Sequence, residues 1–457
     1  MPFLAFAPRF AVRKTMTDSP TCLQKAATSL CRPLITLREA EPGERWFYCL
    51  FWSFWIHLAF FPVSYTFRDI MPVISFIFLV LYYRHNWSGS VLARLRVRPL
   101  FYCLWLMVLV GIVCSINPFD SLLHAGTALN KGFILPFIAM ECVREGKDLR
   151  RLALACVFAV FWQGLDGVWQ AVTGHDFVMG YPLNTQRLTG SLGDYFAGNY
   201  IALTMIPAFG LWFILRQKFS PLFSAFLWFA VLWPGFFLLA GAATRAGMLS
   251  VAAATGLWYI LRPCGGLKPL WKFALPASVA VFALGCLIFF TPRTSGISVD
   301  GVIQDGRWSL WNLGWRVFAE HPWFGAGAGQ YNAAFRALGL TPSSDPITIT
   351  HPHNLYLDIL YAHGIVGFCL GMTFLLGFVW WGYKHIRPHL DAECSAAENN
   401  PQNSIYWRLA VWFWIGFVCW LVNGIFGHNF YRIWYLALAM CHLGIMTGAI
   451  VNGENKP

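Results

Sequence analysis

One histidine and three arginines are the residues of this sequence best suited to chemistry. His353 stands in the stretch THPHNLYLDILYAHG, and the glycine-containing stretches QRLTGSLG, AATRAGM and GRWSLW hold Arg187, Arg245 and Arg307. Histidine is the side chain best able to move a proton near neutral pH. Arginine offers a rigid fork of donors that suits phosphate, and glycine lets a ligand approach the main chain closely. The four residues therefore indicate a site that holds an anion such as phosphate and moves a proton.

Each of these residue types also has an ordinary structural explanation. An arginine near a membrane boundary most often snorkels or caps a helix end, and we assign that role to Arg68 and Arg432. Arg316 and Arg336 are open between the two roles. His353 could equally be a helix cap or an interfacial residue.

Side chains near His353 could take part with it. His351 lies two residues earlier and could serve in its place. Asn354 follows directly, and Asp358 lies one helical turn further on, where it could orient a histidine or pair with an arginine. His363 could line the same cavity or simply pack.

No pattern in the sequence predicts a metal site. There is no HExxH, no DxD and no Cys/His cluster, and the 13 cysteines include no CxxC pair. Asp300 and Asp305 flank a turn that could bind a cation, but a solvated loop is the commoner arrangement. We therefore expect metal-independent chemistry without a cofactor, and no disulfides.

Membrane helices must position these residues. The chain has 457 residues, of which 57% are hydrophobic and 12% charged, and its mean hydropathy is +0.54; soluble domains carry about 25% charged residues. A bilayer core of about 30 Å needs about 20 apolar residues per helix. About twelve candidate spans result, near residues 46–65, 69–83, 99–116, 121–142, 151–172, 195–215, 221–240, 245–262, 272–291, 355–383, 405–425 and 430–450.

Two of these spans are irregular. Span 69–83 is short. Span 121–142 contains Gly126, Asn130, Lys131 and Pro136, so we expect it to be broken or to line a cavity.

Basic residues predict the orientation. Of the 33 Lys and Arg residues, 24 fall on the side of the N-terminal tail and eight on the opposite side. The richer side is cytoplasmic by the positive-inside rule, so we expect both termini in the cytoplasm and the site facing the periplasm. The same rule explains the net charge of +12 without a nucleic-acid partner.

The spans divide the chain into five parts. We expect a cytoplasmic tail at 1–45 without a cleaved signal peptide, spans 1–9 within 46–291, a periplasmic loop at 292–354, spans 10–12 within 355–450, and a cytoplasmic tail at 451–457.

The periplasmic loop should contain amphipathic helices. In the stretch 306–322, four aromatic residues recur at spacings of three and four and predict one helical face, which we expect to lie in the membrane interface: Trp308, Trp311, Trp315 and Phe318. Pro322 ends this helix, and a second short helix is predicted around 329–338.

The combined motifs resemble those of the O-antigen ligase/polymerase superfamily. His353-Asn354 followed by Gly364 is similar to its signature, and Arg307 with EHPWFGAGAGQY resembles the segment before it. Arg187 in RLTG and Arg245 in TRAG resemble the two other arginine motifs of the family. The likeness covers roughly residues 185–385 and the twelve-span layout, and it is strongest to the lipopolysaccharide O-antigen ligases.

The resemblance implies an all-α, GT-C-like glycosyltransferase of the bacterial inner membrane, acting in lipopolysaccharide biosynthesis. Such a ligase transfers polysaccharide from undecaprenyl pyrophosphate to lipid A–core oligosaccharide, with inversion and without a metal. By resemblance, His353 is the general base, preferred over His351 by register, and the three arginines hold the donor pyrophosphate.

Other functions remain open. An O-antigen polymerase or a protein O-oligosaccharyltransferase would use the same donor, although the short tail VNGENKP favours a ligase over protein glycosylation. An anion or lipid-linked glycan transporter is the non-enzymatic alternative. Transporters often contain inverted repeats, and none is evident in this sequence.

Overall fold

The computed structural model describes residues 41–63, 65–183, 187–193, 197–261, 306–339, 351–395, 401–427 and 430–454. These residues form helices joined by turns and loops and include no β-strand. The all-α prediction is therefore confirmed for this part of the chain. The predicted span at 272–291 and most of the predicted tail at 1–45 lie outside the described residues.

Seven helical segments in these ranges are long and apolar enough to cross a membrane. They coincide with seven of the predicted spans and lie in α3 (Tyr65–Asn86), α8 (Gly146–Thr173), α9 (Ala197–Ala208) with α10 (Leu211–Arg216), α11 (Pro221–Gly241), α17 (Leu355–Ser395), α18 (Pro401–Asn423) and α19 (Ile433–Gly453). The chain is thus a multi-pass membrane protein.

Three further helices match predicted spans in position. They are α2 (Pro42–Phe60), α5 (Pro99–Val113) and α12 (Arg245–Leu261). The total of twelve spans stays a prediction, because the described residues do not cover the whole chain.

The second predicted span is longer than expected. Helix α3 has 22 residues, from Tyr65 to Asn86, although 69–83 was predicted. The apolar run stops at Tyr82 and Tyr83, but both tyrosines and the following polar residues continue the helix.

The predicted span at 121–142 is interrupted, as its composition indicated. It consists of α6 (Pro118–Ala128), a π-helical turn η1 (Leu129–Phe133) and α7 (Leu135–Glu141). Proline has no N–H and suits the first turn of a helix, so Pro136 marks the new start. The charge of Lys131 in the π-helical turn is compensated by Asp69 at 2.9 Å.

Local sequence signals set the ends of several helices. At the start of α8, the side chains of Glu145 and Asp148 form a capping box, and Gly174 ends the helix in the left-handed conformation with φ 84°. At the start of α11, Ser220 accepts a hydrogen bond from the N–H of Phe223, and Pro221 follows at the first helical position.

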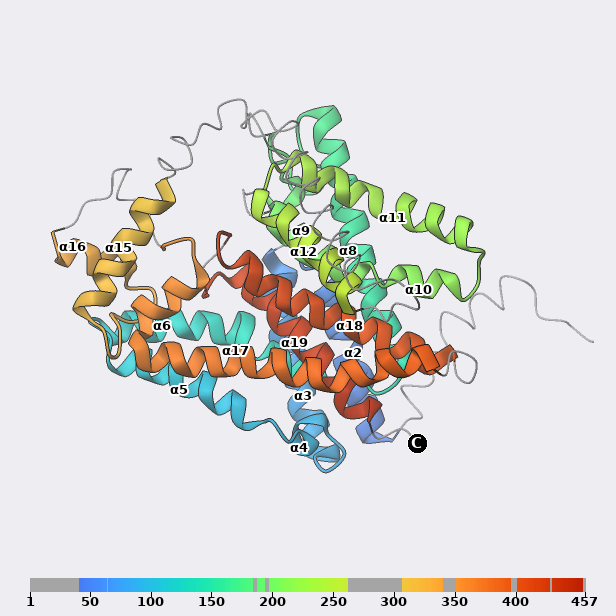
Figure 1. Cartoon of the computed structure of the whole chain (residues 1–457), viewed down its shortest axis with the longest axis horizontal. Coiled ribbons are helices and arrows are strands. Elements are labelled where there is room, and N and C mark those ends of the chain that lie inside the picture. Colours follow the sequence, from blue (N-terminus) through green and yellow to red (C-terminus); the bar gives the residue numbers. More distant parts are fainter. Residues whose placement is uncertain are drawn as a thin grey trace, which may run out of the picture.

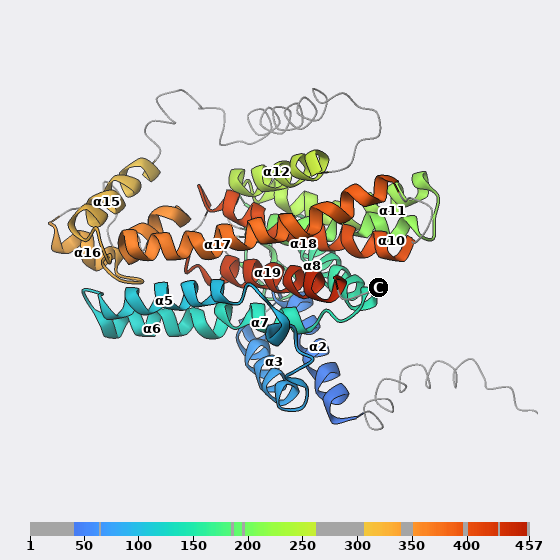
Figure 2. The same cartoon turned by 60° about the horizontal axis from the view of Figure 1, so that its bottom comes forward.

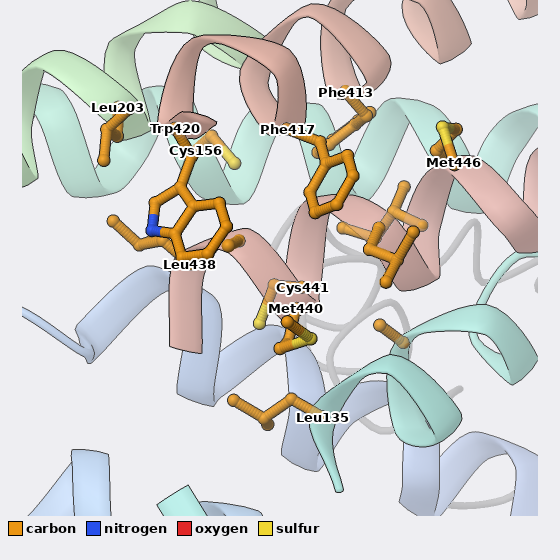
Figure 3. Close-up of a cluster of buried hydrophobic side chains, with 14 of the residues drawn as sticks. Leu135, Cys156, Leu203, Phe413, Phe417, Trp420, Leu438, Met440, Cys441 and Met446 are labelled. Carbon is orange, nitrogen blue, oxygen red and sulfur yellow. The ribbon is translucent and has the colours of Figure 1, made fainter. Parts of the chain in front are cut away.

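Helices α18 and α19 form the centre of the bundle (Figure 1, Figure 2). Every residue of α19 from Trp434 to Val451 is buried, as expected for a helix covered on all sides. Figure 3 shows the core between them, where Trp420 lies beside Leu438. The ring of Trp420 is stacked with that of Phe417, with ring centroids 6.1 Å apart. Close packing in this core fixes α18 and α19 against each other.

Helices α8 and α11 approach each other at glycines. A Cβ added at Gly164 of α8 would overlap the main chain of Pro234 and Gly235 in α11. A Cβ added at Gly235 would in turn overlap the side chain of Val160. Small residues at such crossings let two membrane helices pack backbone to backbone.

Replacing Gly164 by alanine should therefore destabilise the protein, by about 1–3 kcal/mol, because the added methyl meets main-chain atoms that cannot rotate away. The apparent unfolding temperature in detergent measures this. Gly126→Ala in α6 is the matched control, since open space surrounds that position. Equal unfolding temperatures for the two variants would contradict the close α8–α11 crossing.

Candidate functional site

The start of α17, where His353 and Asn354 lie, is bound to the turn that follows α18. The N–H of Leu355 donates to the carbonyl of Gly424 at 2.7 Å. The side chain of Asn354 donates to the carbonyl of Ile425 at 3.1 Å. The predicted histidine motif is thus fixed to the end of a central helix.

Three other helices meet the same end of α18. The ring of Phe426, in the turn after α18, stacks on Trp311 at 5.9 Å, which places α15 (Gly306–Glu320), the helix of Arg307, beside it. The buried amide of Asn423 donates to Ser250 of α12 at 2.9 Å and to Asn199 of α9 at 3.3 Å. These three polar residues were not among the predicted site residues, although asparagine and serine within apolar runs were the available signal.

The segments that carry Arg187 and Arg245 both adjoin the end of α11. The N–H of Leu188 donates to the carbonyl of Gly241 at 3.0 Å, and Arg245 begins α12 four residues after that glycine. Arg187 is half-buried, whereas Arg245 is exposed. The structure therefore gathers the elements of all four predicted residues around the end of α18 and the end of α11 (Figure 1).

Two non-glycine residues within the described ranges have positive φ, and both belong to these motifs. They are His353 with φ 53° and Ala243, two residues before Arg245, with φ 50°. This conformation costs free energy for residues with a side chain, and it persists only where surrounding contacts impose it. The main chain is thus constrained beside the histidine and beside one arginine.

The cap of α17 is Asn354 and not His353. The side-chain oxygen of Asn354 accepts hydrogen bonds from the N–H groups of Tyr356 at 3.0 Å and Leu357 at 2.9 Å. The capping explanation that was open for His353 is therefore fulfilled by its neighbour. His353 lies before the helix, exposed, with its ring centroid 4.2 Å from that of His351.

Asp358 and His363 bind the segment that leads into α19. The buried carboxylate of Asp358 accepts the N–H of Phe430 at 2.9 Å. The buried ring of His363 lies 2.9 Å from the hydroxyl of Tyr431 through Nε2. Asp358 thus anchors main chain, which is neither of the two roles considered for it, whereas His363 packs within the bundle, one of the two roles considered for that residue.

A tight joint connects the loop after α15 to a break in α17. Gly364 leaves the helical conformation, with φ 62° and ψ −168°. The N–H groups of Ala326 and Gly327 donate to the carbonyls of Tyr361 and Ala362 at 2.8 and 2.9 Å. Beyond the break, the N–H groups of two further residues of α17, Ile365 and Val366, donate to the carbonyls of Pro322 and Trp323 at 2.8 and 3.2 Å.

Glycine is required on both sides of this joint. A Cβ at Gly325 would overlap the main chain of Ala362 and His363, and a Cβ at Gly364 would overlap that of Trp323. Both glycines have positive φ. The joint therefore explains why EHPWFGAGAGQY and the histidine signature occur together: each completes the hydrogen bonds of the other.

The loop helices lie close to the predicted positions, at α15 (Gly306–Glu320) and α16 (Tyr331–Ala337). The aromatic face of α15 is divided: Trp308 and Trp315 are exposed, whereas Trp311 stacks on Phe426. Trp308 and Trp315 are seven residues apart, so their side chains point in nearly the same direction from the helix and are exposed together. That the exposed pair lies in the membrane interface stays a prediction.

A buried tyrosine joins the two loop helices. The hydroxyl of Tyr331 donates to the carbonyl of Leu310 at 2.6 Å. Burial, and then the nearby charge of Asp358, raise the pKa of Tyr331, so its proton is retained and the donation persists.

Two arginines outside the site, Arg68 and Arg316, have structural partners. Arg68 pairs with Asp69 at 2.5 Å and lies over the ring of Trp434 at 4.8 Å. Arg316 donates to Asn312, one turn earlier, at 3.1 Å. No group of three or more potential metal ligands occurs within the ranges that the structure describes.

Comparisons with known proteins identify the same region. Residues 229–372 match a family model described as O-antigen ligase; the matched part contains Arg245, Arg307 and His353 but not Arg187. An O-antigen ligase of Pseudomonas aeruginosa is 27% identical over 153 residues, a match that covers 32% of this chain and 33% of that protein. The predicted resemblance to the O-antigen ligase/polymerase superfamily is thus confirmed.

Gly364→Ala should open the joint between α17 and the loop. The added methyl meets the main chain of Trp323, and a positive φ disfavours alanine, so we expect a loss of about 2 kcal/mol or more. Thermal unfolding in detergent and the rate of proteolysis after α15 report the change. Gly43→Ala is the control, because a Cβ added there would lie 3.8 Å from its nearest neighbour, the Cβ of His85. A Gly364→Ala protein as stable as this control would show that the joint is not rigid.

Proposed function

We propose that this chain is an O-antigen ligase, which transfers polysaccharide from undecaprenyl pyrophosphate to lipid A–core oligosaccharide at the periplasmic face of the bacterial inner membrane. One observation carries the proposal: the elements of His353 and of the three arginines converge on the ends of α18 and α11. A family match that covers three of the four motifs supports it.

In this proposal Arg187, Arg245 and Arg307 bind the donor pyrophosphate. When the bond between the sugar and the phosphate breaks, its electron pair goes to the pyrophosphate, whose negative charge increases. Cationic donors already in place stabilise that charge without reorganisation, and they act more strongly where the bilayer lowers the dielectric constant. No metal is required for this role.

His353 acts as the general base. It takes the proton of an acceptor hydroxyl while the hydroxyl oxygen forms the new bond to the anomeric carbon of the donor sugar, opposite to the departing pyrophosphate. A single displacement of this kind inverts the anomeric centre. The capping by Asn354 and the ring contact with His351 support this role, because both restrict where the imidazole can lie.

The orientation belongs to the same proposal. The bias of Lys and Arg along the sequence supports cytoplasmic termini and a periplasmic site within a GT-C-like arrangement of about twelve spans. Both substrates carry lipids, so they can reach the site laterally from the outer leaflet.

An O-antigen polymerase is the nearest alternative, since it would use the same donor and the same chemistry on a lipid-linked acceptor. A protein O-oligosaccharyltransferase would differ only in its acceptor. A transporter of anions or of lipid-linked glycan would use the arginines without forming a glycosidic bond.

Reconstitution with separately supplied substrates distinguishes these activities. Purified protein in proteoliposomes should cap lipid A–core with polysaccharide when given the undecaprenyl-pyrophosphate donor, and gel mobility of the lipopolysaccharide measures the product. Growth of the lipid-linked chain without capping would instead identify a polymerase. Movement of anion without glycan transfer would identify a transporter.

His353→Ala should abolish capping while the protein stays folded and inserted, because no base remains at the acceptor hydroxyl; we expect a loss of at least about a hundredfold. His351→Ala should retain most of the activity. Wild-type capping by the His353→Ala protein would refute the assignment, and loss in His351→Ala alone would move the base to His351.

Alanine at Arg187, Arg245 or Arg307 should weaken binding of a lipid pyrophosphate and slow transfer by about tenfold to a thousandfold. Binding of farnesyl pyrophosphate, followed by calorimetry, separates affinity from rate. The matched control is Arg316→Ala, an exposed arginine on the same helix as Arg307 whose partner is Asn312. An equal effect at Arg316 would indicate a general effect of charge on the membrane surface.

A further inference from the structure

Three buried polar side chains line one face of α8 near its end. Gln163, Asp166 and Gln170 are spaced by three and four residues, so they point in one direction along the helix. Each is at most 4% exposed, in a helix that crosses the membrane. Polar groups in such a position are costly unless they are bonded, and we call these three residues the α8 polar ladder.

The ladder binds the main chain of the segment that follows Arg187. The side-chain oxygen of Gln170 accepts the N–H groups of both Thr189 and Gly190 at 2.9 Å. The carboxylate of Asp166 accepts the N–H of Ser191 at 2.5 Å. Three successive N–H groups are therefore held by one helix face.

Side-chain groups of the same segment complete the contact. The hydroxyl of Ser191 donates to the side-chain oxygen of Gln163 at 2.9 Å. The amide of Gln170 donates to the hydroxyl of Thr189 at 3.3 Å. Gly190 has φ 53°, and a Cβ there would approach the amide nitrogen of Gln163 at 2.5 Å, so the segment lies directly on the ladder.

The ladder also binds residues that precede Arg187 in the connection between α8 and α9. The other carboxylate oxygen of Asp166 accepts the N–H of Phe177 at 2.7 Å, and the amide of Gln170 donates to the carbonyl of Tyr181 at 3.3 Å. Both sides of the connection that carries Arg187 are thus attached to the same two residues of α8.

These contacts fix the main chain directly after Arg187. Leu188 is bonded to Gly241 of α11, and residues 189–191 are bonded to the ladder. A solvated loop would need none of these buried partners. The accumulation of acceptors next to one arginine indicates that the position of this arginine, rather than the fold alone, is what the ladder secures.

We propose that the α8 polar ladder is a positioning device for Arg187, with Gln170 as its principal member, and that it sets the affinity of the site for a lipid pyrophosphate. The inference rests on the proposed function, in which Arg187 binds that group. Gln170 is the principal member because it alone bonds two successive N–H groups and donates to two further oxygens. It acts through Arg187 and touches no substrate.

A double-mutant cycle tests this role. Gln170→Met keeps the length of the side chain and removes all four hydrogen bonds. Binding of farnesyl pyrophosphate to the full-length protein in detergent should weaken about tenfold to a hundredfold in Gln170→Met, the size expected for a misplaced binding group. In an Arg187→Ala background the same substitution should weaken binding by less than about twofold, because the group that it misplaces is already gone.

Thr204→Val is the matched control. Thr204 is equally buried, but its hydroxyl bonds to the carbonyl of Tyr200 within its own helix, α9. This variant should lower the unfolding temperature without changing the affinity for farnesyl pyrophosphate. If Gln170→Met does not fold, Gln163→Met removes the acceptor of the Ser191 hydroxyl and takes its place in the cycle.

The outcomes separate the two levels of the proposal. Equal losses from Gln170→Met with and without Arg187 would overturn the positioning role while leaving the pyrophosphate site intact. Unchanged affinity in Gln170→Met would do the same. Unchanged affinity in Arg187→Ala itself would overturn the role of Arg187 in the proposed function, and the ladder inference with it.

Discussion

The structure depends on one constraint: wherever a helix breaks or ends inside the bilayer region, its main-chain N–H and carbonyl groups must find partners within the protein. At Gly364 the helix α17 is interrupted, and the loop 322–327 supplies two donors and two acceptors across the break. Two carbonyls after the end of α18, those of Gly424 and Ile425, accept hydrogen bonds from residues at the start of α17. The donors are the N–H of Leu355 and the side-chain amide of Asn354. The α8 polar ladder solves the same problem for the segment after Arg187.

These solutions explain why the site motifs are short and rich in glycine. A loop that completes the hydrogen bonds of a helix must lie directly against its main chain, and at Gly325 and Gly364 no Cβ fits between the two. The residues proposed to do the chemistry stand one or two positions from such contacts. His353 precedes the cap Asn354, and Arg187 precedes the bonded N–H of Leu188. Rigid placement of the charged and basic groups therefore follows from how the membrane bundle satisfies its own backbone.

Much of the helical layout could be predicted from apolar runs, because length and hydropathy decide which segments cross a bilayer. The interruption of the predicted span 121–142 was indicated by Gly126 and Pro136 in the sequence. Its π-helical form could not be predicted from these residues. The cap of α17 follows the local preference of asparagine for this position, whereas the contacts of Asn354 with Ile425 and of Asp358 with Phe430 could not be predicted, because they join residues more than 70 positions apart. The α8 polar ladder was missed for the same reason: its residues look like isolated polar positions until the fold brings residues 189–191 onto them.

The left-handed backbone of His353 has a consequence for how this position evolves. Glycine adopts that conformation at little cost, and asparagine more readily than histidine. Selection for folding alone would therefore favour glycine or asparagine at this position. Among homologous chains that share this backbone, the frequency of histidine at the position measures selection for imidazole chemistry separately from selection for stability.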